Sequence, residues 1–269
     1  MHQKRRQNKG LTWSIVLISL LMISLLTSGI FSSIRLAQAA AHATLPLPWQ
    51  TRDIGHVTHA GSVSVHGGTF VVGGSGSDIW GNADQFRYVY QPMQGNGEIS
   101  ARVQHQIGAS DWSKAAVMIR ESLADNSADA MTLLTPRHGA AFQWRSGTGR
   151  NTSTITPGPM VRAPYWIRIV RSGTTLQGFI SANSSHWRRL GSVSLKMAQT
   201  VYIGLAVTSH NHARLSTATF DDILLNITPP PPPMTPSPTI EVTVIITFQS
   251  LSSLAVPQSR ERTQKKAWR

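Results

Sequence analysis

Between Trp49 and Ile227 the chain alternates apolar and polar residues over short stretches, and glycine-rich or polar turns separate these stretches. Alternation with a period of two is typical of a β-strand with one face on a core, and no stretch keeps the helical period of 3.6. The expected strands are residues 63–66, 69–72, 86–91, 98–104, 114–121, 130–135, 141–145, 165–170, 176–180, 201–208 and 218–225. Many short strands joined by turns predict an all-β sandwich or barrel.

The stretch 73–91 combines both signals. It begins rich in glycine, which favours sharp turns, and ends in strict alternation with aromatic residues at every second position of 86–90. We therefore expect a loop carrying Asp78, Trp80 and Asp84 to be fixed to a sheet edge. Trp80 has two interpretations: a platform on which a ligand stacks, or a plug over the end of the core, since tryptophan is largely buried on average.

The alternation also assigns a direction to each side chain. The inward positions are Ile99, Ala101, Val103, Ala115, Val117, Ile119, Phe142, Trp144, Tyr165, Ile167 and Ile169. The opposite positions are Arg102, Gln104, Met118, Arg120, Gln143, Arg145, Trp166 and Arg168. Because the register is fixed wherever one face is buried, we expect Arg120, Arg145 and Arg168 to share one sheet.

A sheet face with several arginines, amides and a tryptophan can bind sugars. Sugar rings stack on aromatic faces, and arginine and glutamine donate hydrogen bonds to hydroxyls and carboxylates. The candidate ligand-binding residues are Trp80, Arg120, Gln143, Arg145, Trp166 and Arg168. The crowded arginines predict a preference for acidic glycans. The alternative is an ordinary solvated face, or arginines paired with Glu121 and nearby carbonyls.

Several motifs resemble one family in the same order along the chain. They are Asp53-Ile54-Gly55, Gly76-Ser77-Asp78-Ile79-Trp80-Gly81, Ala83-Asp84-Gln85-Phe86, 97–103, 114–122, 164–168 and 201–210. Over roughly Trp49 to Leu225 the chain resembles the concanavalin A-like lectin/glucanase domain, of the regulation-of-enolase-protein-like type found in secreted bacterial proteins. The resemblance implies a jelly-roll sandwich of two antiparallel sheets with a concave face, beside carbohydrate-active modules. Two positions depart from the family: Ala116 replaces a glycine, and 183–186 replace an Asp-Gly turn before Trp187, which weakens the case for a ligand contact there.

The residues give little support for catalysis. A glycosidase needs two carboxyl groups across the scissile bond, and the region 49–227 holds only two glutamates, Glu98 at an apparent hairpin flank and Glu121 at a strand end. No nucleophile elbow, phosphate loop or metal-binding spacing is present. We assign no catalytic or metal residue and no cofactor. Calcium is a minor alternative, with Asp78, Asp84, Asp221 and Asp222 as its oxygen ligands.

The first 39 residues have the pattern of a secretory signal. Basic residues at 4–9 precede a mostly apolar, uncharged run from Leu11 to Ile34, and small residues at 37–39 or 41–43 offer a cleavage site. We expect a mature protein that begins between residues 40 and 44. Because the apolar run is long, an uncleaved membrane anchor is the alternative.

Changes in composition along the chain divide it into four expected parts. The expected parts are the signal at 1–39, a sandwich domain at 44–228, a proline-rich linker at 229–239 and a disordered basic tail at 240–269. Of the net charge of +13, five charges lie before residue 40 and three after Pro229, which leaves +5 for the sandwich. A charge this modest does not favour nucleic acid as a partner. The chain has no cysteine, which fits a bacterial source.

Together these observations predict a secreted or cell-surface, non-catalytic module that binds a polysaccharide or a cell-surface glycan. The alternatives are a glycan hydrolase that uses Glu121 with a distant aspartate, or a structural spacer domain. Contact with a membrane is expected only through an uncleaved N-terminal segment.

Overall fold

The computed structural model describes residues 45–155 and 158–230. The predicted signal segment and the tail after residue 230 lie outside the described residues. The described part is all strands and connections, without a helix. Its strands are β1 Gln50–Ile54, β2 Ser62–His66, β3 Thr69–Gly76, β4 Ile79–Trp80, β5 Ala83–Asp84, β6 Phe86–Ile107, β7 Lys114–Arg120, β8 Asp129–Leu134, β9 Ala140–Arg145, β10 Thr152–Ile155, β11 Tyr165–Ser172, β12 Thr175–Ser181, β13 Arg188–Ser194, β14 Thr200–Thr208 and β15 Asn211–Thr228.

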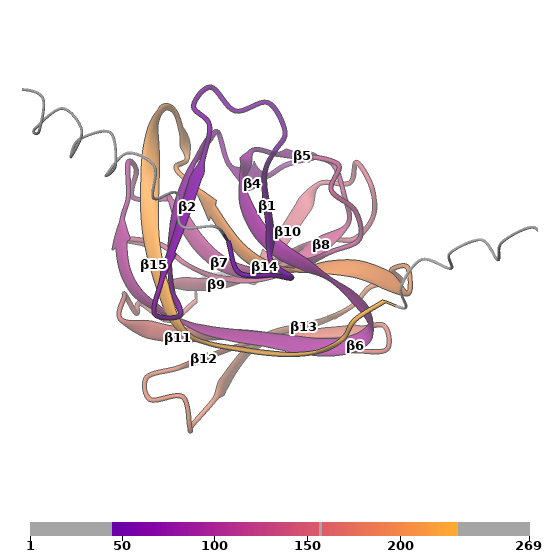
Figure 1. Ribbon diagram of the computed structural model, residues 1–269. Coiled ribbons are helices and arrows are strands. Elements are labelled where there is room, and N and C mark those ends of the chain that lie inside the picture. Colours follow the sequence, from indigo (N-terminus) through magenta and orange to yellow (C-terminus); the bar gives the residue numbers. More distant parts are fainter. Residues whose placement is uncertain (1–44, 156–157, 231–269) are drawn as a thin grey trace, which may run out of the picture. The chain divides into compact units, whose positions relative to one another are not determined.

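The strands form two facing layers, seen edge-on in Figure 1. The first sheet has the order β10-β9-β8-β7-β14-β6-β1, and the second has the order β2-β3-β15-β6-β11-β12-β13. Every pairing is antiparallel. The prediction of an all-β sandwich of two antiparallel sheets is therefore confirmed for the described residues.

Strand β6 belongs to both sheets, and the prediction of two separate strands in this region is wrong. The two strands expected at 86–91 and 98–104 are one strand of 22 residues that bends near Gly95, where φ is +68°. Its first half pairs with β1 and β14, and its second half pairs with β11 and β15. Glu98 therefore lies within a strand of the second sheet, opposite Val170, and not beside a hairpin.

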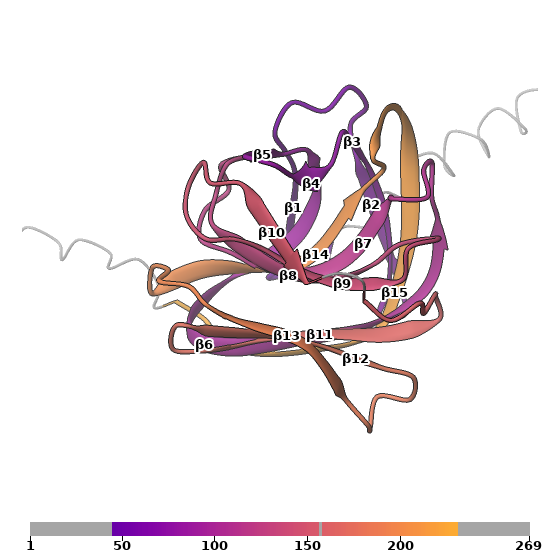
Figure 2. The ribbon, with the colours of Figure 1, turned by 180° about the vertical axis from the view of Figure 1, so that it is seen from behind.

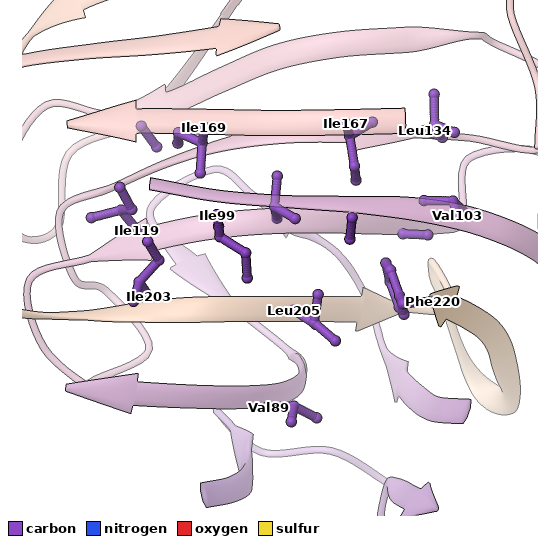
Figure 3. Close-up of a cluster of buried hydrophobic side chains, with 14 of the residues drawn as sticks. Val89, Ile99, Val103, Ile119, Leu134, Ile167, Ile169, Ile203, Leu205 and Phe220 are labelled. Carbon is purple, nitrogen blue, oxygen red and sulfur yellow. The ribbon is translucent and has the colours of Figure 1, made fainter. Parts of the chain in front are cut away.

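The core fills the space between the layers, as Figure 3 shows. The predicted inward positions are confirmed, with Trp144 and Tyr165 only partly buried at its margin. Phe142 of β9 packs against the paired glycines Gly178 and Gly191 of the second sheet. A β-carbon at either glycine would lie within 2.7 Å of the Phe142 ring, so their small size brings the sheets together here.

The outer face of the first sheet is also buried, by a second apolar cluster that includes Ile79, Phe86, Tyr88 and Met118. Strands β4 and β5 form a short hairpin that lies over this face. Figure 2 shows them on the side of the first sheet away from the second, while the connection between β12 and β13 projects from the opposite side of the molecule. The loop expected at a sheet edge, with Asp78, Trp80 and Asp84, therefore covers a sheet face instead.

Candidate functional site

Two of the predicted arginines lie in a buried ion-pair cluster beneath this cover. Arg145 binds Asp84 through two hydrogen bonds of 2.5 and 2.8 Å and binds Asp129 at 2.9 Å. Arg120 reaches the same Asp84 at 3.4 Å. Each of these four side chains is at most 1% exposed. We call this group the buried ion cluster.

The two arginines also donate to main-chain carbonyls, and Arg145 donates to the hydroxyl of Thr152. Arg145 donates to the carbonyls of Gly81, Ser127 and Arg150, and Arg120 donates to those of Ser122 and Ala124. Arginine in this setting cannot bind an external ligand, because its donors are occupied and out of reach. The expectation that Arg120 and Arg145 form part of an exposed arginine face is therefore wrong.

Burial also changes the acid–base properties of the cluster. Burial and the neighbouring Asp84 raise the pKa of Asp129 to about 7, against the opposing effect of Arg120 and Arg145. The pKa of Tyr88, whose hydroxyl donates to the carbonyl of Met118, is also raised by burial. A carboxyl group with a raised pKa suits acid catalysis, but this one is sealed from solvent.

The third arginine, Arg168, lies on the other sheet, which corrects the expectation that all three share one. It lies on β11 opposite Ser100, and its side chain is 29% exposed. It lines an open pocket of about 290 Å³ on the outer face of the second sheet. We call it the tryptophan pocket; its lining residues are Glu98, Ser100, Trp166, Arg168, Ser184, Trp187, Asp222 and Leu224.

Ion pairs fix the polar groups of the tryptophan pocket. Arg168 donates to Glu98 from two nitrogens, and its guanidinium carbon lies 5.5 Å from the centre of the Trp187 ring. Arg102 lies 4.9 Å from the centre of the Trp166 ring. It is held by two 2.7 Å hydrogen bonds to Asp221, which raise the pKa of the guanidinium. Both tryptophans are thus backed by arginines that cannot move freely.

The connection between β12 and β13 supplies one wall of this pocket. The side-chain oxygen of Asn183 accepts hydrogen bonds from the main-chain N–H groups of Ser185 and His186, at 3.2 and 3.1 Å. Asparagine commonly organises turns in this way. Ser184 has a φ of +61°, and both Ser184 and Trp187 reach the pocket. The segment that departs from the family pattern therefore contributes directly to the candidate site.

Gln143 lies apart from all of these, in a second pocket on the outer face of the first sheet. This pocket has a volume of about 340 Å³. We call it the glutamine pocket; its lining residues are Trp112, Lys114, Leu133, Thr135, His138, Gly139, Ala141, Gln143, Gly158 and Met160. Apart from Trp80, the predicted site residues are therefore divided between two pockets and the buried ion cluster.

Trp80 lines neither pocket. It lies on β4 and is 42% exposed, with the Lys114 ammonium group 5.4 Å from its ring centre. That ammonium group binds Asp78 at 2.7 Å and donates to the carbonyl of Ile79, and burial lowers its pKa. Trp80 thus covers a buried lysine, while part of its ring stays open to solvent.

The remaining acidic candidates are held in structural contacts. Glu121, proposed as a catalytic group, accepts a hydrogen bond from the main-chain N–H of Ala198 at 2.8 Å and lines neither pocket. The four aspartates considered for calcium pair with different cations: Asp78 with Lys114, Asp84 with Arg145, and Asp221 and Asp222 with Arg102. Within 45–155 and 158–230, no three His, Asp or Glu side chains gather as a metal site.

Of the residues that line the two pockets, sequence reasoning identified only Trp166, Arg168 and Gln143 and missed, among others, Trp112, His138, Glu98 and Trp187. Trp112 and His138 stack with ring centres 3.6 Å apart, although they come from loops 26 positions apart in the sequence. Glu98 and Trp187 were noted only as turn residues. A tryptophan close to a polar turn is the one sequence signal that could have marked Trp112 and Trp187.

Comparisons with known proteins identify the fold and no family. No family model and no curated protein matches the chain. A functionally unknown protein from Saccharomyces cerevisiae matches with a TM-score of 0.53 and 15% identity, over 66% of this chain and 97% of that chain. A GH43 protein from Bacillus licheniformis matches with a TM-score of 0.51 and 17% identity, over 70% of this chain but only 38% of its own length.

A carbohydrate binding module from Bacillus subtilis is more distant, with a TM-score of 0.44 and 15% identity. In the part of the chain that the structure describes, no helix is long and apolar enough to span a membrane. The architecture and the first two matches agree on the fold: the described residues form an all-β sandwich of two antiparallel sheets.

Proposed function

We propose that this protein is a non-catalytic glycan-binding module whose binding site is the tryptophan pocket. The observation that carries the proposal is the pairing, in one open pocket, of two tryptophan rings with the Arg168–Glu98 ion pair. Sugars present an apolar ring face edged by hydroxyl groups, so they bind where an aromatic surface adjoins fixed donors and acceptors. Both kinds of group are in place before any ligand arrives.

The Arg168–Glu98 ion pair offers a ligand both hydrogen-bond donors and hydrogen-bond acceptors. Arg168 can only donate and Glu98, when ionised, can only accept, whereas a sugar hydroxyl can do both at once. A hydroxyl placed beside the pair can therefore accept from the guanidinium and donate to the carboxylate. Since the pair is already formed, little side-chain entropy is lost when a ligand binds.

The charges around the pocket favour neutral glycans. Glu98 and Asp222 face the pocket together with Arg168, and Asp221 and Arg102 lie beside it. These three carboxylates and two arginines leave no excess of positive charge for a uronic acid to bind. The preference for acidic glycans rested on three arginines sharing one sheet, and the fold removes that basis.

Two arguments support binding without cleavage. Glycoside hydrolysis needs one carboxyl group kept protonated near neutral pH and a second one on the other side of the scissile bond. In the tryptophan pocket Glu98 binds Arg168 and Asp222 binds Arg102, so each of these carboxyl groups is already held by an arginine. The carboxyl group with a raised pKa, Asp129, is 1% exposed and lies in the other sheet.

The proposal extends to location and partner. The signal-like N-terminus supports a secreted or cell-surface protein, and the partner is then a polysaccharide or a glycan outside the cell. Assignment to the regulation-of-enolase-protein-like type of concanavalin A-like domain remains part of this proposal. It rests on the motifs of the sequence.

Calorimetric titration of the full-length protein with neutral and acidic oligosaccharides tests the proposal. The neutral set holds glucan and xylan fragments, and the acidic set holds pectin and alginate fragments. We expect neutral fragments to bind, and Trp187→Ala to weaken them about tenfold or more. Trp80→Ala, which removes an exposed tryptophan on the other sheet, is the matched control. Release of new reducing ends would favour the hydrolase, and equal binding by Trp187→Ala would refute the assigned site.

A further inference from the structure

The glutamine pocket has a chemistry different from that of the tryptophan pocket. Its floor is formed by outward side chains of β8 and β9, chiefly Leu133, Ala141 and Gln143. The loop before β7, the loop between β8 and β9, and Gly158 and Met160 between β10 and β11 form its rim, where Trp112 is 44% exposed and Met160 is 69% exposed. An apolar floor with a few polar groups and exposed large side chains around it is typical of a ligand pocket.

Gln143 places in this floor a polar atom that has no hydrogen-bond partner among the described residues. The residue is 5% exposed, and its Oε1 atom is buried with no hydrogen-bond partner among the described residues. The described part of the chain holds two other such atoms, on Arg87 and Arg171, and neither residue lines the tryptophan pocket or the glutamine pocket. Because an unsatisfied buried acceptor is unfavourable, a ligand that donates a hydrogen bond here gains affinity from it.

The carboxamide of Gln143 is complementary to another amide. Its oxygen accepts from an amide N–H, and its NH₂ group donates to an amide carbonyl. The neighbouring side chains Leu133 and Ala141 are apolar and offer contact to a methyl group. An acetamido group carries an N–H, a carbonyl and a methyl group within a few ångströms, and so matches all three features.

The rim offers a surface for a sugar ring. Trp112 and His138 stack with an angle of 12° between their planes. Two contacts join the loops that carry them: the Arg137 side chain binds Asp111 at 3.1 Å, and the main-chain N–H of Arg137 donates to the carbonyl of Asp111 at 3.4 Å. A ring pair fixed in this way can stack on a pyranose without reorganising.

We infer that the glutamine pocket is a second binding site, which accepts an N-acetylated amino sugar. The acetamido group binds Gln143 and packs on Leu133 and Ala141, while the pyranose ring lies against Trp112. This site does not depend on the tryptophan pocket, which is on the other sheet and contains no carboxamide. A chain with both sites binds two different sugars on its two opposite faces.

The test compares two oligosaccharides that differ only in the acetamido group. Chitotetraose carries it, and cellotetraose has the same linkage with a hydroxyl group in its place. Titrations of the full-length protein use three variants: Gln143→Leu, Trp187→Ala, and Gln50→Leu as a matched control, since Gln50 is exposed on β1 at the far edge of the same sheet. Thermal unfolding shows whether each variant is folded.

We expect Gln143→Leu to weaken chitotetraose at least about tenfold and to leave cellotetraose unchanged. Gln50→Leu should behave as the wild type, and Trp187→Ala should keep its chitotetraose binding. If Gln143→Leu does not fold, Trp112→Ala replaces it, together with the side-chain amide signal of Gln143 in a ¹⁵N spectrum, which chitotetraose must shift. Equal affinity for the two sugars, loss of chitotetraose binding in Trp187→Ala, or an unmoved Gln143 signal would overturn the inference.

Discussion

Arginines on the outer faces of the two sheets have opposite surroundings. On the first sheet, Arg120 and Arg145 are fully buried and bind Asp84 and Asp129. On the second, Arg168 is 29% exposed, binds Glu98 and lies beside the Trp187 ring in an open pocket. All three occupy outward positions of their strands, so the alternation of residues does not distinguish them.

The difference lies in what covers each face. The β4–β5 hairpin and the segment after β7 cover the part of the first face that carries its arginines, and they bring Asp84 and carbonyl groups to them. Among the described residues the β12–β13 connection walls Arg168 on one side without closing over it, so Arg168 keeps an aromatic neighbour and contact with solvent. The same residue type stabilises the fold on one face and is available to a ligand on the other.

The largest expected effect is on the stability of the covered face. Arg145→Ala leaves the carboxylates of Asp84 and Asp129 buried with little compensation, so we expect it to lower the free energy of unfolding by about 3–5 kcal/mol. Arg168→Ala, in the partly exposed pair, should lower it by at most about 1 kcal/mol. Denaturant unfolding of both variants measures the difference. Similar losses in the two variants would mean that the two faces are not energetically distinct.

The second prediction concerns pH and the same covered face. Because the pKa of Asp129 is raised to about 7 from an ordinary 3.8, the folded state holds a proton between these values that the unfolded state has lost. The contribution of Asp129 to stability is therefore greatest near pH 4, falls as the pH rises to 7, and is constant above that.

Melting temperatures of the wild type and Asp129→Asn between pH 4 and 8 measure this contribution. The variant keeps the size of the side chain and cannot ionise, so the difference between the two proteins isolates Asp129. We expect the wild type to lose several degrees relative to the variant as the pH rises from 4 to 7. A constant difference across this range would show that Asp129 does not titrate there.

The smallest effect is expected in the salt dependence of binding at the open face. Arg168→Ala should weaken neutral glycans by about 1.5–3 kcal/mol, the usual range for a hydrogen bond from a charged group. Raising the salt from low to moderate concentration should change wild-type affinity little, since the ligand carries no charge. Titration at two salt concentrations checks both statements. A strong salt dependence would restore the acidic-glycan interpretation of the arginines.

The sequence predicted the fold because alternation is a local signal. Residues such as Val117, Ile167 and Phe142 show their inward direction through their immediate neighbours, and all three lie in the core. Residues 86–107 also alternate on both sides of the glycines at 95 and 97, and the sequence did not show that the chain continues there as one strand. The glycines at this point are compatible with a turn between two strands and equally with a bend within one strand.

The site was predicted only in part because it depends on contacts between distant residues. Arg145 meets Asp84 across 61 positions, and Arg168 meets Glu98 across 70. Whether Arg168 shares a sheet with Arg120 depends on the order of the strands. The alternation of apolar and polar residues does not predict that order. Trp166 and Arg168 were correctly given a common direction, while the covering of Arg120 and Arg145 by the β4–β5 hairpin had no local signal.

The central claim is that the open face of the second sheet binds glycans through its tryptophans, and the indole N–H signals of ¹⁵N-labelled protein test it most directly. The protein has eight tryptophans, and single substitutions assign their signals. On titration with the glucan or xylan fragment that binds most tightly, we predict that the signals of Trp166 and Trp187 move together and saturate with one Kd, while those of Trp80 and Trp112 stay in place. Movement of the Trp80 or Trp112 signal with those of Trp166 and Trp187 unchanged, or no movement with any glucan or xylan fragment, would contradict the account.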